Sequence, residues 1–90
     1  MSVIVATRCR VDDFDTWRPK FEAFASTQPA MLSHRIWQGA DDPNQIVLME
    51  TWELREAADA ILSHPQLEEL MAADGVDISS VTMDIVDEVT

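Results

Sequence analysis

The sequence contains a single cysteine, Cys9, and this scarcity limits both its redox chemistry and its means of stabilisation. One cysteine cannot form an internal disulfide, so the chain fits a reducing compartment. Cys9 lies in an apolar stretch without a Cys-His pattern, which is typical of a small buried side chain rather than a nucleophile. The two histidines, His34 and His64, are far apart and lack a third ligand at metal spacing, so we expect no bound metal.

Basic residues are also scarce, with 6 Lys and Arg against 17 Asp and Glu and a net charge of −11. Residues 41–90 contain only Arg55 as a basic group, and a nucleic-acid-binding surface needs cations to replace the counterions of phosphates. No apolar run approaches the roughly 20 residues of a membrane-spanning helix, and no signal peptide is recognisable. We therefore expect a soluble, cytoplasmic protein that binds neither nucleic acid nor membranes.

The alternation of apolar residues predicts a small α+β fold in one domain, residues 1–90. Strict alternation over residues 2–11 indicates a strand, and the aromatic residues that follow recur at helical spacing. The expected elements are a strand at 2–11, a helix from about Asp15 or Thr16 to Thr27 capped by Asp12 or Asp13, a hairpin of strands 31–38 and 45–52, helices at 54–62 and 65–74, and a strand at 80–89. Pro19 would then lie in the first helical turn, where its missing amide is tolerated.

This β-α-β-β-α-β order predicts a ferredoxin-like, four-stranded antiparallel sheet with both helices on one face. The strands carry apolar groups on both sides, so the other face of the sheet needs a cover. A thin core in a chain of 90 residues also favours self-association. We expect a homodimer in which two sheets face each other as a dimeric α/β barrel.

Three segments, 11–17, 41–52 and 62–76, resemble the dimeric α/β-barrel superfamily, in particular antibiotic-biosynthesis-monooxygenase-like domains. The most characteristic piece is the Glu-Thr-Trp ending of the third strand, residues 50–52. The resemblance covers essentially the whole chain. It implies membership of a superfamily that includes cofactor-free oxygenases of polyketide-type aromatics, polyketide cyclases, lactone isomerases and haem-degrading enzymes. Haem-degrading members place a tryptophan and a histidine where this chain has Ile61 and Met71, so we expect neither haem nor any other cofactor.

Glu50 and His34 are the candidate catalytic residues. In the predicted hairpin, one register sets His34 opposite Glu50, and a register shifted by one sets Arg35 there. A buried carboxylate in mid-strand needs a partner. The pair could be a cross-strand contact that supports the fold or an acid–base unit in a pocket.

Arg8, Trp37 and Trp52 are the candidate pocket residues. Trp52 is two residues from Glu50 and so shares its face of the strand, and an aromatic wall suits a flat aromatic ligand. Arg8 could bond to Glu50, anchor an anionic oxygen or form a salt bridge with Asp84 or Glu88. The resemblance implies a small cofactor-independent enzyme, of monooxygenase or cyclase type, acting on an aromatic or polyketide-like molecule, and these residues could form its pocket. The alternatives are a non-catalytic ligand-binding domain and a structural dimer module.

Overall fold

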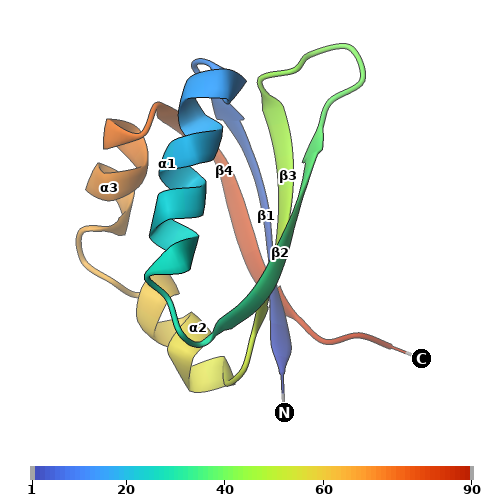
Figure 1. Cartoon of the computed structure of the whole chain (residues 1–90), viewed down its shortest axis with the longest axis vertical. Helices are drawn as coiled ribbons and strands as arrows, with labels where there is room; N and C mark the ends of the chain where they lie inside the picture. Colours follow the sequence, from blue (N-terminus) through green and yellow to red (C-terminus); the bar gives the residue numbers. More distant parts are fainter. Residues whose placement is uncertain (1, 90) are drawn as a thin grey trace.

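The computed structural model describes residues 2–89, which form a four-stranded antiparallel sheet with its helices packed on one face (Figure 1). The strand order in the sheet is β2-β3-β1-β4. The prediction of a ferredoxin-like α+β fold is therefore confirmed. The elements in chain order are β1 (Val3–Val11), α1 (Phe14–Ser26), β2 (Met31–Gln38), β3 (Gln45–Trp52), α2 (Arg55–Leu62), α3 (Leu67–Ala73) and β4 (Val76–Val86).

Strand β1 is central and separates its side chains cleanly by face. Its odd-numbered residues, from Val3 to Val11, are buried beneath the helices, whereas Arg8 and Arg10 are exposed on the other side. Strand β3 does the same with its even-numbered residues, and Ile46 and Trp52 are almost fully buried. The core thus lies between the helices and one face of the two central strands.

Helix α1 begins one to two residues earlier than expected. Asp13 caps it, because its carboxylate accepts hydrogen bonds from the amide and the hydroxyl of Thr16 at 3.0 and 2.7 Å. As a result Pro19 lies in the second turn rather than the first, so the prediction of its position is wrong. Pro19 removes the amide that would otherwise donate to the carbonyl of Asp15, on the exposed side of the helix.

Strand β4 begins at Val76, four residues before the expected start. Gly75 ends the preceding helical segment with a φ of 88°, in the left-handed region that glycine adopts without strain. The pairing of β4 with β1 shifts between Arg8 and Arg10, where a bulge interrupts the ladder. At this bulge the amide of Arg10 donates to the hydroxyl of Ser80 at 2.8 Å.

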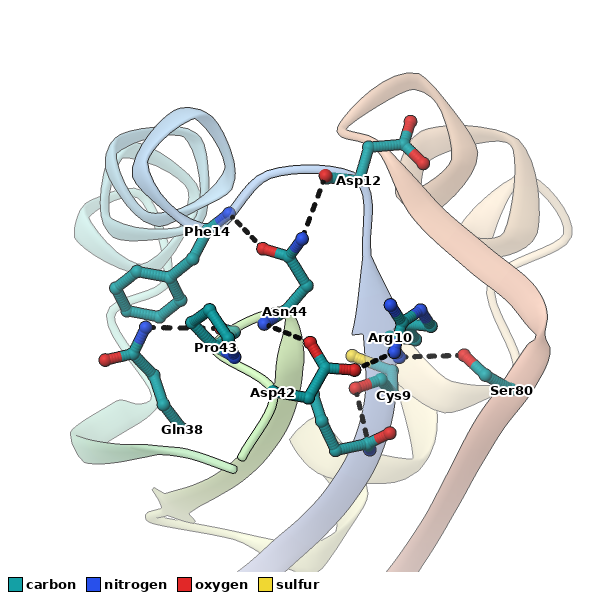
Figure 2. Close-up of polar contacts among 10 residues, drawn as sticks. Cys9, Arg10, Asp12, Phe14, Gln38, Asp42, Pro43, Asn44 and Ser80 are labelled. Atoms are coloured by element: carbon teal, nitrogen blue, oxygen red, sulfur yellow. Dashed lines mark hydrogen bonds and ion pairs between the residues drawn. The ribbon is translucent and has the colours of Figure 1, made fainter. Parts of the chain in front are cut away.

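The loop between β2 and β3 is bonded to the loop that precedes α1 (Figure 2). Asn44 accepts a hydrogen bond from the amide of Phe14 at 3.0 Å and donates to the carbonyl of Asp12 at 3.2 Å. The side chains of Arg10 and Asp42 form an ion pair nearby. These contacts fix the start of α1 relative to the sheet.

The face of the sheet opposite the helices is open. It carries the exposed side chains of Trp37, Met49 and Val86, together with Arg8 and Arg35. No helix among residues 2–89 has the length and apolar character needed to cross a membrane.

Candidate functional site

A cavity of about 350 Å³ lies between the sheet and the helices. Its volume is at the lower end of the range of small-molecule sites. Four aromatic side chains contribute to its wall: Trp17, Phe21, Phe24 and Trp52. Helices α2 and α3 supply aliphatic side chains, and β1 supplies Val5, Thr7 and Cys9. The cavity is therefore largely apolar and suited to a flat, apolar ligand.

Glu50 is the ionisable group of β3 in this wall. The two-residue period of β3 sets it between Leu48 and Trp52 on the buried side, and it is 7% exposed. The indole Nε1 of Trp52 donates a hydrogen bond to Glu50 Oε1 at 3.3 Å. Burial raises the pKa of Glu50 to about 7, and the hydrogen bond from Trp52 opposes this rise only in part. At neutral pH this carboxyl group can therefore accept or release a proton.

The partner of Glu50 differs from the expected ones. The prediction named His34, Arg35 or Arg8, but within residues 2–89 the side chain that hydrogen-bonds to the carboxylate is Trp52. The indole satisfies one carboxylate oxygen without adding a positive charge. Because no cation compensates the charge, desolvation dominates the pKa of Glu50.

His34 lies directly opposite Glu50 in the β2–β3 ladder, which is one of the two registers that the sequence allowed. Its ring packs edge-on against Phe21, with ring centroids 5.1 Å apart. His34 lines a separate shallow depression with Phe14 and Arg18, outside the cavity. The structure therefore brings His34 near Glu50 in the sheet but does not place it in the cavity.

Arg8 and Trp37 lie on the open face of the sheet. The guanidinium carbon of Arg35 sits 5.1 Å from the ring centroid of Trp37 on that face. Arg8 pairs in register with Val47 and Thr82, and its side chain is exposed. Neither Arg8 nor Trp37 lines the cavity, so these two residues do not lie in this pocket as expected. Trp52, by contrast, lies in the wall beside Glu50.

Thr7 and Cys9 also line the cavity, although the sequence reasoning did not select them as site residues. The signal was available, because both alternate with Val5 on the buried face of β1. Burial raises the pKa of the Cys9 thiol, which keeps it protonated and poorly nucleophilic.

The two positions that the resemblance matched to the working residues of haem-degrading domains also border the cavity. Ile61 and Met71 both contribute apolar side chains there. Among residues 2–89 no three His, Cys, Asp or Glu side chains cluster as metal ligands would. The polar side chains on the cavity wall include Glu50 and Thr7, which can form hydrogen bonds with an organic ligand.

Comparison with known proteins agrees with this architecture. Among solved structures, the chain is similar to a mutant of SnoaB, a cofactor-independent oxygenase from Streptomyces nogalater, with a TM-score of 0.73 and 18% identity over 99% of this chain and 94% of that one. It is similar to an antibiotic biosynthesis monooxygenase (TM-score 0.71, 18% identity, 98% and 99% covered). It is also similar to a dimeric ferredoxin-like protein of unknown function from a Jannaschia species (TM-score 0.64, 11% identity, 98% and 100% covered).

Curated protein sequences gave no significant match. The family model for antibiotic biosynthesis monooxygenase, in contrast, matches residues 1–73, which is most of the chain. The structural likenesses, at such low identities, show a shared fold. On the family match, this chain belongs to the antibiotic biosynthesis monooxygenase family.

Proposed function

We propose that this protein is a cofactor-independent oxygenase of small aromatic or polyketide-like molecules, which it holds in the cavity between sheet and helices. The observation that carries the proposal is the buried Glu50, with a pKa of about 7, in a wall made mostly of aromatic and aliphatic side chains. A general base works best when its pKa lies near the working pH. Family membership and the likeness to SnoaB support the same class of chemistry.

The reaction needs a substrate with an acidic C–H group, such as the methylene between two aromatic rings of an anthrone. Glu50 takes a proton from this methylene, and the aromatic rings spread the resulting negative charge. The carbanion is electron-rich enough to reduce O2 directly. One methylene and one O2 then become one carbonyl and one water, so the atoms and electrons balance without a flavin or a metal.

The surroundings of Glu50 favour this proton transfer. In a largely apolar cavity the buried carboxylate is poorly solvated and hence more basic than in water. The Trp52 indole holds one of its oxygens in place at 3.3 Å. Transfer of a proton from a neutral substrate moves the negative charge within the cavity but leaves its total unchanged.

We further propose that the protein acts as a homodimer joined through the open face of the sheet. Trp37, Met49 and Val86 are exposed there, and a second copy would remove them from water. The similar Jannaschia protein is described as dimeric. Such a dimer leaves the cavity on the helix side of each sheet.

Oxygen uptake with anthrone as the substrate tests the proposed reaction. The wild-type protein should accelerate O2 consumption above the rate in buffer. Glu50→Gln keeps the size of the side chain and an acceptor for Trp52 but removes the base, so it should lower the rate by about 10²–10⁴-fold. The reaction should form one carbonyl product for each O2 consumed, which is the stoichiometry that the proposed reaction requires.

The matched control is Glu56→Gln, which makes the same change at an exposed carboxylate in the first turn of α2. This variant should keep the wild-type rate. A wild-type rate no faster than buffer, or equal rates for wild type and Glu50→Gln, would contradict the proposed reaction.

A further inference from the structure

Thr7 is the buried polar residue in the cavity that the proposed reaction leaves without a role. It lies on the central strand β1 and is 6% exposed. A buried hydroxyl normally has a hydrogen-bond partner. Within residues 2–89 no hydrogen bond joins the Thr7 side chain to another residue, and no polar side-chain atom is both fully enclosed and unpaired. The hydroxyl is therefore accessible from the cavity and free to bond with a ligand.

Thr7 and Glu50 are diagonal neighbours on the same face of the sheet. In the β1–β3 ladder Thr7 pairs with Leu48, and Val5 pairs with Glu50. Thr7 is therefore two residues along β1 from the position directly opposite Glu50. Diagonal neighbours of this kind have their Cα atoms roughly 7–8 Å apart. One small ligand can contact both groups.

The charges around the cavity restrict that ligand. The described residues that line it include two carboxylates, Glu50 and Asp74, and no lysine, arginine or histidine. An anion would lose its hydration there without gaining a cationic partner. A neutral carbonyl or phenolic oxygen needs only one good donor, which a hydroxyl supplies.

We propose that the Thr7 hydroxyl donates a hydrogen bond to an uncharged oxygen of the ligand, and that the cavity thereby selects neutral ligands in which this oxygen lies close to an acidic hydrogen facing Glu50. This inference rests on the proposed function for the role of Glu50. It adds a binding residue and a ligand class. When the substrate loses its proton, charge moves onto the same oxygen, and the bond from Thr7 becomes charge-assisted and stronger.

Binding of three bicyclic probes that share one ring system tests the proposal, by chemical-shift titration of the whole protein at about pH 8.5, well above the pKa of Glu50. At this pH Glu50 is a carboxylate and cannot replace Thr7 as a donor. The probes are α-tetralone, which has a carbonyl oxygen; tetralin, which has none; and tetralin-1-carboxylate, which is an anion. The wild-type protein should bind α-tetralone at least about twofold more tightly than tetralin, since a neutral hydrogen bond contributes about 0.5–1.5 kcal/mol net.

Thr7→Val removes the hydroxyl and keeps the branched shape. It should weaken α-tetralone binding by about twofold to tenfold and leave tetralin binding unchanged. Thr7→Ser keeps the hydroxyl and should bind α-tetralone like the wild type. Thr82→Val, the same change on the open face of the sheet, is the matched control. The carboxylate probe should bind at least about tenfold more weakly than the ketone because its desolvation is not compensated.

Equal binding of α-tetralone by the wild type and Thr7→Val would overturn the role of Thr7. Binding of the carboxylate as tight as that of the ketone would overturn the ligand class, and wild-type protein that binds none of the probes would overturn both. The comparison of α-tetralone with tetralin uses only the wild-type protein, so it tests for a hydrogen-bond donor in the cavity even if a Thr7 variant fails to fold. Oxygen uptake by wild type and Glu50→Gln is measured separately, so the proposed reaction can fail or stand independently of Thr7.

Discussion

Glu50 makes the free energy of unfolding depend on pH in the direction opposite to that of an ion-paired carboxylate. Its pKa is about 7 in the folded protein, against an ordinary value of 4.5. Between these two pH values the folded state holds a proton that the unfolded state has lost. The free energy of unfolding therefore falls as pH rises through this window, and the contribution of Glu50 levels off above pH 7.

Replacing Glu50 with Gln should remove this part of the pH dependence. Relative to the wild type, the variant should gain about 3 kcal/mol of unfolding free energy between pH 4.5 and pH 8. Urea unfolding of both proteins across this range, at one protein concentration, measures the difference. Subtracting the wild-type free energy of unfolding from that of the variant at each pH removes the contributions of the other carboxylates, which both proteins share. A difference that stays constant with pH would show that Glu50 titrates normally in the folded protein.

Single residues of the site could be predicted where strand alternation alone decides the face. Glu50 and Trp52 are two apart and share the buried side of β3, as the sequence indicates. Trp37 is three residues from His34 and so faces the opposite way, a signal that the sequence reasoning did not use. Alternation also put Arg8 on the face of β1 opposite Val5, but it does not say which face the helices cover.

Among the elements, the hairpin strands β2 and β3 were predicted with the bounds that the structure shows, 31–38 and 45–52. Both are regular, and the turn residues between them mark where each strand ends. Strand β4 was predicted to begin four residues later than it does, because the bulge opposite Arg8 and Arg10 breaks its period. Its predicted end at residue 89 also lies three residues beyond the observed end at Val86. Near this bulge Asp77 accepts hydrogen bonds from Ser79, a local pattern that resembles a turn in the sequence.

Helix packing around the cavity was the part that the sequence left open. Helices α2 and α3 are only eight and seven residues long and are separated by a break at 63–66. The break lets the two short helices line different parts of one wall, with Ile61 from α2 and Met71 from α3. Helical periodicity indicates which face is apolar, but it does not indicate that the packing leaves a cavity.

The whole molecule has one covered and one open sheet face, and this asymmetry predicts its assembly. The mass in solution, measured by light scattering, should be twice the 10.1 kDa of one chain. Met49→Asp introduces a negative charge on the open face, and the two-fold axis of the dimer brings a second copy of this charge into the same interface. Because burying these charges is costly, the variant should shift the protein towards the monomer.

Leu54→Asp is the matched control for this prediction, because Leu54 is also an exposed apolar residue but lies at the start of α2, away from the open face. It should remain dimeric. A wild-type mass equal to one chain at micromolar concentration, or an unaltered dimer in Met49→Asp, would contradict an interface on this face of the sheet.

The pH dependence of anthrone-driven oxygen uptake, corrected for the rate in buffer, tests the central claim most directly. Glu50 acts as a base only when it is ionised, and its carboxylate form becomes populated as pH rises through about 7. The account predicts that the catalysed rate increases with a midpoint near pH 7 and then reaches a plateau, and that Glu50→Gln lacks this rise. A catalysed rate that does not change across this range, or a Glu50→Gln profile equal to that of the wild type, would contradict it.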